Sequence, residues 1–330
     1  MKLTEPASMD ATAQATLIAT GGVSGVELVE VAIERIDRLN TQLACVIYPR
    51  FDIAAASRTD RTNGREFTLN IEIQSFGGRT MSELVLRQDQ DGLATLTLNR
   101  PDKLNALNVE MFIELRAHVD KIASETDRVG LIVVRGAGKC FSAGHDLTDI
   151  AAGERPPKPN FQADTIERLA DLPQPVISAV HGHCYTGALE LALAGDLIFA
   201  AESARFADTH ARWALTPVWG MSQRLPRRVG LPKSREMMLT CRTYSGAEAL
   251  AMGLANMCVP DAKFDSELRA LADMILANSW YSHRANKRML IETDGLPLGA
   301  GLAHEVYRSK GVGPDMRERI AAFTNKTRRT

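Results

Sequence analysis

Three short, continuous runs of apolar residues constrain the fold of this chain more than any other feature of its sequence. They are Leu131–Val134, Val176–Val180 and Leu197–Ala200, and none shows the polar alternation of a strand with one solvated face. Runs of this kind are typical of parallel strands that are buried on both faces. The segments between them have helical patterns, which completes a βα alternation. Since the residues from about 233 onward are predicted to be mostly helical, the sequence predicts an α/β fold followed by helices.

A hairpin and a capped helix are predicted just before the first of these runs. Leu84–Arg87 and Leu93–Leu98 flank Asp91-Gly92, a dipeptide that favours a tight turn between antiparallel strands. In the second strand the leucines are expected to point one way and the threonines the other. Asn108 is expected to cap a helix that ends near Ser124 and carries one apolar face. The residues of that face are Met111, Leu115, Val119 and Ile122.

Composition excludes several classes of protein. Lys and Arg number 39 against 40 Asp and Glu, so the net charge of −1 gives no basic footprint for nucleic acid. The five cysteines form no CxxC pair, which argues against a zinc ribbon or a disulfide scaffold, so no metal site is predicted. We expect no secretory signal and no membrane span, because there is no long apolar run. A cytoplasmic location is therefore expected.

Residues 1–80 differ in pattern from the rest of the chain. Ser24 and Glu27 fit a capping box, and apolar residues at helical spacing continue from there to about Leu43. A shorter helix is predicted before it, over about residues 10–19. Residues 57–80 are rich in Ser, Arg, Thr, Asn and Gly, and Gly77-Gly78 is typical of a linker. The segment is predicted to be a helical N-terminal appendage.

Part of this appendage resembles the N-terminal helical fragment of the amidase signature family. The resemblance lies in residues 10–13, 23–30 and 38–43, and it covers residues 8–56. The chemistry of that family needs a lysine and two serines on a Gly/Ser-rich stretch further along the chain. No such stretch follows here, so amidase activity is not expected.

Two later stretches carry the residues most suited to chemistry. Phe141–Leu147 follows a predicted strand and contains a small-small-Gly turn, which lets the backbone approach a ligand closely. His181–Leu191 also follows a predicted strand and opens a helix near Gly187. The free N–H groups and positive dipole of a helix N-terminus can hold a negative oxygen. Glu190 is expected in the first turn of that helix.

Together with Asn99–Asn108 upstream and Ala204–Phe206 downstream, these stretches make residues 81–330 similar to the crotonase (enoyl-CoA hydratase/isomerase) superfamily. The order and spacing of the motifs match over essentially the whole segment. The resemblance implies a crotonase-like ββα spiral core over residues 81–270 and a C-terminal helical trimerisation region over 271–330. It also implies homotrimers, which often pair into homohexamers.

The resemblance also implies an oxyanion hole and a set of contacts to coenzyme A. His145 and Gly187 match the two residues whose backbone N–H groups hold the carbonyl oxygen of an acyl-CoA thioester, where such donors stabilise the enolate. The positions that match substrate or coenzyme A contacts are Lys103, Ala143, Gly144, Asp146, Phe323 and Lys326. Coenzyme A is expected as part of the substrate, with no permanently bound cofactor.

The catalytic pair is where this sequence departs from the family. Hydratases of the superfamily use two glutamates, and Glu190 matches the first. His210 stands where the second glutamate is expected, with Asp208 two residues earlier on the same face if the segment is extended. Either His210 or Asp208 could therefore be the second acid or base. Trp213 and Trp219 are expected to reshape the acyl pocket.

The leading hypothesis is an enoyl-CoA hydratase of fatty acid metabolism that adds water across the 2,3 double bond, with Glu190 as acid/base. An enoyl-CoA isomerase that moves a proton between C2 and C4 is one alternative. Another is a different CoA-thioester reaction of the superfamily, such as decarboxylation or hydrolysis. A non-catalytic acyl-CoA binder is the alternative from a different class. Retention of Glu190 argues against a non-catalytic binder, and absence of the second glutamate argues for one.

Overall fold

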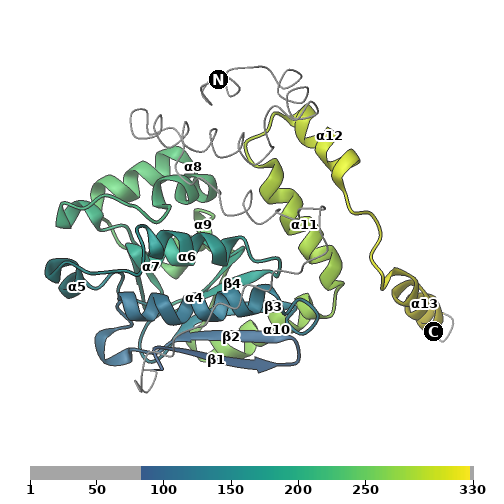
Figure 1. Ribbon diagram of the computed structural model, residues 1–330, viewed down its shortest axis with the longest axis horizontal. Coiled ribbons are helices and arrows are strands. Elements are labelled where there is room, and N and C mark those ends of the chain that lie inside the picture. The colour runs from purple at the N-terminus through teal and green to yellow at the C-terminus, as the bar shows by residue number, and fades with distance from the viewer. Residues whose placement is uncertain (1–82, 328–330) are drawn as a thin grey trace, which may run out of the picture. The chain divides into compact units, whose positions relative to one another are not determined.

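The computed structural model describes residues 83–327, with side chains described up to Asn325. The predictions for residues 1–80, which include the Ser24 capping box, the linker and the amidase resemblance, lie outside the described residues. Within the described part, no helix is long and apolar enough to cross a membrane. Figure 1 shows a layered arrangement in which helices pack against a β-sheet.

The predicted hairpin is present and is longer than expected in its first strand. β1 (Val85–Gln90) pairs antiparallel with β2 (Leu93–Leu98). Asp91 and Gly92 both have positive φ, at 52° and 83°, as a tight turn that matches the twist of its strands requires. Leu96 and Leu98 are fully buried. The alternation predicted from the sequence is therefore confirmed.

The three apolar runs form the centre of a six-stranded sheet with the order β1-β2-β3-β4-β6-β9. β3 (Leu131–Gly136), β4 (Val176–Val180) and β6 (Leu197–Ala201) pair in parallel, as predicted. The sequence analysis missed β9 (Met257–Val259), because three residues are too few to show a pattern. Along β3, alternate side chains enter separate apolar clusters, one on each face of the sheet.

A second sheet has three strands, and two of them directly precede residues of the candidate site in the sequence. It contains β5 (His183–Tyr185), β7 (Arg205–Ala207) and β8 (Tyr244–Ser245). β5 leads directly into α7 (Gly187–Ala192), the helix predicted near Gly187. The expectation of an extended segment through His210 is wrong, because β7 ends at Ala207 and His210 begins the 3-10 helix η3 (His210–Trp213).

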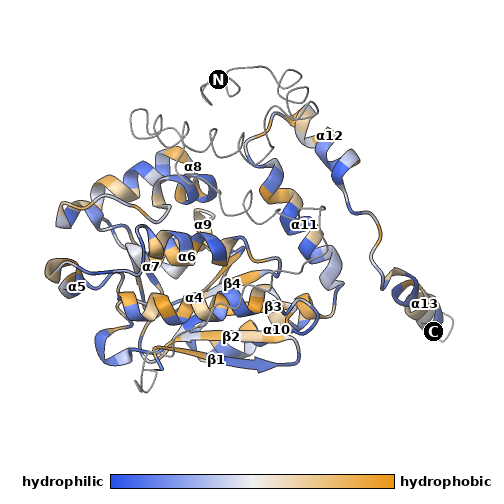
Figure 2. Cartoon of the chain, in the orientation of Figure 1, coloured by the Kyte–Doolittle hydropathy of each residue, from blue (hydrophilic) through white to orange (hydrophobic). Residues whose placement is uncertain are grey.

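The remaining helices of the core flank the main sheet. Asn108 caps α4 (Val109–Ala123) by accepting a hydrogen bond from Met111 N, and the predicted apolar face of α4 is buried. α4 lies beside α6 (Phe161–Ala170), as Figure 1 shows. An ion pair of 2.7 Å between Arg116 and Asp164 links the two helices. Figure 2 shows apolar colours along β2 and β3, the strands that α4 covers. The other elements of this region are η2 (Pro101–Lys103), α5 (Leu147–Ala152), α8 (Met221–Thr240), α9 (Gly246–Ala251) and η4 (Asp261–Lys263).

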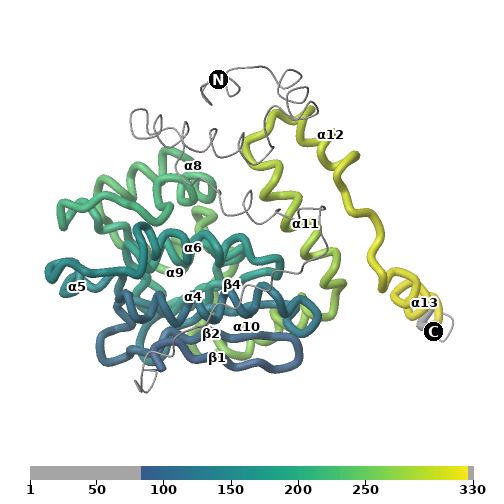
Figure 3. Tube along the Cα trace, viewed as in Figure 1, coloured from purple at the N-terminus to yellow at the C-terminus, as the bar shows by residue number. Residues whose placement is uncertain are grey.

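Four helices complete the chain: α10 (Phe264–Leu276), α11 (Trp280–Thr293), α12 (Leu298–Arg308) and α13 (Met316–Thr327). α10 packs on the sheet through Phe264 and Leu268. α11 is fixed to the core by the buried Lys287, whose ammonium contacts Asp196 at 2.8 Å and the Gln174 carbonyl oxygen at 3.0 Å. Figure 3 traces the chain from α12 through an irregular stretch to α13.

Candidate active site

The loop after β3 and the junction of β5 with α7 approach each other closely. Gly144 has φ 103°, and a Cβ at this position would lie 2.5 Å from the Tyr185 carbonyl oxygen, so only glycine fits. A Cβ on Gly187 would lie 3.3 Å from the backbone nitrogen of His145. Because the nitrogen and Cβ of a residue share one Cα, the backbone nitrogens of His145 and Gly187 lie within about 6 Å of each other.

Both of these backbone N–H groups are available to a ligand. Leu107 donates to the Gly144 carbonyl oxygen at 2.8 Å and accepts from Asp146 N at 2.9 Å, so the N–H of His145 points to the opposite side. Gly187 is the first residue of α7, where an N–H has no partner within the helix. Within residues 83–327, neither N–H donates to a protein acceptor. The structure therefore places two free donors side by side.

Trp219 forms one wall beside these donors. A Cβ on Gly187 would lie 2.5 Å from the Trp219 ring, so the ring packs directly on the glycine. The same ring lies 4.5 Å from the His145 imidazole and 5.0 Å from the Phe112 ring, between centroids. Trp219 is buried, whereas Trp213 is 55% exposed. Of the two tryptophans expected to shape the pocket, Trp219 shapes its inner end and Trp213 lies at its rim.

Glu190 is held rigidly, with one carboxylate oxygen left for chemistry. It is only 1% exposed, and its Oε1 accepts hydrogen bonds from Trp219 N at 2.9 Å and Met221 N at 3.0 Å. Its Oε2 lies 3.7 Å from Nε2 of His210. Burial raises the pKa of the Glu190 carboxyl above its ordinary value, although the two N–H groups and His210 oppose this effect.

His210 is oriented by Asp208, and both residues are buried. The Asp208 Oδ1 lies 2.6 Å from Nδ1 of His210 and also accepts the backbone N–H of His210 at 3.1 Å. With Nδ1–H donated to Asp208, a neutral imidazole presents its unprotonated Nε2 to Glu190. The two candidates for the second acid or base thus lie in series, with His210 nearer to Glu190.

These groups surround one cavity of about 580 Å³. Its walls include His145, Gly187, Glu190 and His210 from the predicted site, and Ala143 at one edge. Asp208 is not part of the walls, because it lies behind His210. The cavity therefore combines two free N–H donors with a carboxylate and an imidazole.

The comparisons with known proteins agree with this geometry. Residues 88–327 match the model of the family described as "Enoyl-CoA hydratase/isomerase". The chain belongs to the enoyl-CoA hydratase/isomerase family of the crotonase superfamily. It is 32% identical over 227 residues to an Arabidopsis thaliana protein named "Probable enoyl-CoA hydratase 1, peroxisomal", covering 68% of this chain and 84% of that one.

Two further relatives differ in what their names say. The "1,2-epoxyphenylacetyl-CoA isomerase" of Escherichia coli is 32% identical, with 74% of this chain and 97% of that one covered. A Thermobifida fusca protein solved in complex with acetoacetyl-CoA has a TM-score of 0.63 and 27% identity, covering 67% of this chain and 91% of that one. Crotonase-fold neighbours confirm the predicted fold class.

This member of the enoyl-CoA hydratase/isomerase family places its predicted coenzyme A contacts in three different settings. Lys103 is exposed at the end of η2. The next residue, Leu104, contacts the loop after β3, because its carbonyl oxygen accepts a hydrogen bond from Ala143 N at 2.9 Å. Gly144 provides the close approach described above. On α13, Phe323 is 72% exposed and does not line the cavity. Lys326 lies on the same helix, where its side chain is outside the described residues.

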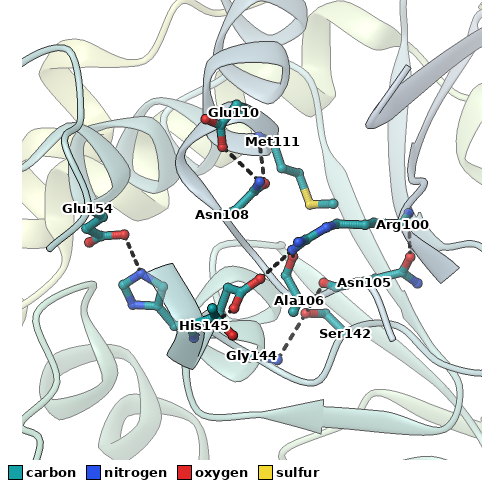
Figure 4. Close-up of polar contacts among 12 residues, drawn as sticks. Arg100, Asn105, Ala106, Asn108, Glu110, Met111, Ser142, Gly144, His145 and Glu154 are labelled. Atoms are coloured by element: carbon teal, nitrogen blue, oxygen red, sulfur yellow. Dashed lines mark hydrogen bonds and ion pairs between the residues drawn. The ribbon is translucent and has the colours of Figure 1, made fainter. Parts of the chain in front are cut away.

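Asp146 has its carboxylate engaged inside the protein. Its Oδ1 accepts from Thr148 N at 2.9 Å and so caps α5, while its Oδ2 contacts Arg100 at 2.6 Å. Arg100 also donates to the Ala106 carbonyl oxygen, as Figure 4 shows. Asp146 does not line the cavity. The carboxylate of Asp146 therefore helps to hold the loop after β3 against Arg100, and its contact with coenzyme A stays a prediction.

Thr186 and Glu154 are among the polar residues of the cavity that the sequence analysis did not predict. Thr186 adopts φ 52° and ψ −110°, a conformation that non-glycine residues rarely adopt, directly before Gly187. Its hydroxyl is held by the backbone N–H of Thr209 at 3.2 Å. Glu154 follows Gly153, which ends α5 in the left-handed conformation. That helix-ending glycine is the one sequence signal that could have indicated a turn back toward the cavity.

Proposed function

We propose that this protein is an enoyl-CoA hydratase that adds water to the 2,3 double bond of an enoyl-CoA thioester. The observation that carries the proposal is the location of the Glu190–His210 pair in the same cavity as the free N–H groups of His145 and Gly187. The Thermobifida fusca relative, solved with acetoacetyl-CoA, supports a thioester as the bound group. The family of the chain supports the same class of substrate.

The two N–H groups would hold the thioester oxygen. When water adds to C3, negative charge develops on this oxygen as the thioester becomes an enolate. Two fixed donors beside a buried wall stabilise that charge without having to reorganise. Removing one such donor in other enzymes costs roughly 10²–10³ in kcat. The donors here are backbone groups, so side-chain substitution at His145 leaves both in place.

Glu190 and His210 would handle the two protons of the reaction. The free Oε2 of Glu190 takes a proton from water as the water oxygen bonds to C3. Nε2 of His210 in its protonated form gives a proton to C2, which completes the addition of H and OH. Because 3.7 Å between Oε2 and Nε2 is too long for a direct hydrogen bond, the proton on Glu190 would return to His210 through one water molecule, which resets the pair.

Asp208 is a positioning residue in this proposal. Within residues 83–327, the hydrogen-bond partner of its carboxylate is His210, through the short Oδ1–Nδ1 contact and the backbone N–H, and Asp208 does not line the cavity. It fixes the imidazole so that Nε2 faces Glu190. His210, and not Asp208, is therefore proposed to replace the second glutamate of family hydratases.

Isomerisation is the second candidate. The Escherichia coli relative named as an isomerase is as similar to this chain as the relative named as a hydratase, at 32% identity. The same pair could remove a proton from C4 and return it to C2, with the enolate held by the same N–H groups. Water would then have no place in the reaction.

We also propose that the protein assembles as a homotrimer or as a homohexamer built from two trimers. The support lies in the C-terminal helices, which leave several large apolar side chains exposed. These are Leu290, Leu298, Val306, Tyr307 and Phe323. Such a surface is typical of an interface. Sedimentation of a monomer at micromolar concentration would contradict this proposal.

The experiment that separates these candidates uses crotonyl-CoA in deuterated water. A hydratase gives 3-hydroxybutyryl-CoA with one deuterium at C2, measured by mass spectrometry, while the absorbance of the conjugated thioester falls. Deuterium exchange without a hydroxylated product favours the isomerase. Binding of crotonyl-CoA without any change in it favours a non-catalytic acyl-CoA binder. The Glu190→Gln variant is the control, because it keeps the N–H donors and loses the base.

A further inference from the structure

A second pair of imidazole and carboxylate groups faces the same cavity, and the proposed hydration does not use it. Nε2 of His145 lies 2.8 Å from Oε2 of Glu154, and the two side chains are 19% and 22% exposed. Both residues line the cavity. Figure 4 shows the two side chains pointing toward each other. The backbone of His145 supplies an oxyanion N–H, so its imidazole lies beside the position of the thioester.

The chain builds this pair by a specific local route. Asp146 starts α5, and Gly153 ends it with φ 71°. The left-handed residue turns the backbone, and Glu154 N then donates to the Asp149 carbonyl oxygen at 3.0 Å. Glu154 is thereby returned toward His145, which immediately precedes the helix cap. The short helix thus acts as a spacer that brings the two side chains together.

A buried residue holds the carboxylate from its other side. Nε2 of Gln162, on α6, lies 3.2 Å from Oε1 of Glu154, and Gln162 is only 4% exposed. The imidazole is held in turn by the Trp219 ring. Each group of the pair is therefore fixed by a buried neighbour. Among the described residues, Nδ1 of His145 has no partner, so this nitrogen is available to a ligand.

We propose that the His145–Glu154 pair recognises a hydroxyl group on the acyl chain of the substrate. An alkyl chain would remove water from the pair and offer no hydrogen bond in return, which is unfavourable. A carboxylate on the acyl chain would meet Glu154 and the buried Glu190. A hydroxyl can donate to neutral His145 or to Glu154, and it can accept from a protonated imidazole, so it fits every state of the pair.

This inference rests on the proposed function, because it assigns the acyl part of the proposed thioester. Its test uses saturated thioesters, which cannot react. Affinities of hexanoyl-CoA and of 4-, 5- and 6-hydroxyhexanoyl-CoA are measured by calorimetry. At least one hydroxylated thioester should bind about tenfold more tightly than hexanoyl-CoA, the effect of one additional hydrogen bond in a dry site. If hexanoyl-CoA binds as tightly as all three, the proposal is wrong.

Two variants decide whether the pair causes the preference. His145→Phe keeps the ring and the backbone N–H but removes the hydrogen bonds of the imidazole, and Glu154→Met removes those of the carboxylate. Both should reduce the tenfold ratio to about one, while Glu305→Met, on α12, serves as the matched control and should keep it. An equal loss of affinity for every thioester would identify the pair as structural only and overturn the proposal. Failure of the proposed hydration appears separately, as unreacted crotonyl-CoA.

Discussion

The two imidazole–carboxylate pairs of the cavity have similar chemistry and different surroundings. Asp208 and His210 are two residues apart in the chain, and both are buried. His145 and Glu154 are nine residues apart, and each is about one fifth exposed. The first pair faces the Glu190 carboxylate at 3.7 Å, whereas the second lies against the Trp219 ring. Both pairs combine an imidazole with a carboxylate. We therefore expect the neighbouring groups to determine what each pair does.

A second carboxylate makes the difference between the pairs. His210 has Asp208 on one ring nitrogen and the Glu190 carboxylate 3.7 Å from the other, a distance that one water could bridge. Among the described residues, His145 contacts one carboxylate and the Trp219 ring. This difference is why we propose acid–base work for the first pair and recognition for the second.

The largest expected effect comes from removing the carboxylate that distinguishes the two pairs. Glu190→Gln should lower kcat for crotonyl-CoA hydration by about 10⁴, the upper range for loss of a general base. Coenzyme A thioester binding should stay within about twofold, because the oxyanion donors are backbone groups. Steady-state kinetics and calorimetry measure the two quantities. Retained hydration in this variant would mean that Glu190 is not the base.

Truncation of the first imidazole should have the next largest effect. His210→Ala should lower kcat by roughly 10²–10³, since Glu190 and the oxyanion donors remain. His210→Glu restores the residue found in family hydratases and should recover much of the loss. The comparison variant is His145→Phe, whose loss of kcat on crotonyl-CoA should be at least tenfold smaller. If the two variants lost the same activity, the division of roles between the pairs would be wrong.

A smaller effect is expected for the residue that orients the imidazole. Asp208→Asn should lower kcat about tenfold and leave KM within about twofold, because substrate contacts are unchanged and only the ring is less well held. A purely structural role would lower thermal stability without this split between kcat and KM. Full activity in Asp208→Asn together with inactive His210→Ala would show that the imidazole needs no partner.

Much of this comparison could be predicted from the sequence, because its parts lie on strongly patterned elements. The apolar runs that begin at Leu131, Val176 and Leu197 predicted three buried parallel strands, which the structure contains as β3, β4 and β6. Gly187 and Glu190 followed from a helix that begins directly after a strand. His210 was named because it stands where the resemblance places a second glutamate, and Asp208 because it lies two residues earlier. What failed was their local geometry, since η3 replaces the extended segment.

The second pair could not be predicted, for a physical reason. Glu154 lies beyond a helix of only six residues, and the neighbouring Gly153 indicates a turn but does not identify a site. Its position depends on the left-handed turn at Gly153 and on Gln162 from another helix. The ion pair of Asp146 with Arg100 was not predicted for a similar reason, because it joins residues far apart in the chain. Contacts of this range become visible only in the folded structure.

The smallest expected effect concerns stability and tests whether the buried charge of Glu190, which faces the first pair, destabilises the folded protein. Burial raises the pKa of Glu190, so between its ordinary and raised values the folded state binds more protons than the unfolded state. The free energy of unfolding therefore falls as pH rises through this window, and the ionised carboxylate costs stability at neutral pH.

Glu190→Gln keeps an oxygen for the N–H groups of Trp219 and Met221 and removes the charge. Its Tm should exceed that of the wild type by a few degrees at about pH 7, and the difference should shrink as pH falls toward the ordinary glutamate value. Glu154→Gln, in the more exposed pair, should show no such gain at about pH 7. Calorimetric scans at a series of pH values measure both variants, and a lower Tm for Glu190→Gln at about pH 7 would show that the buried charge is already compensated.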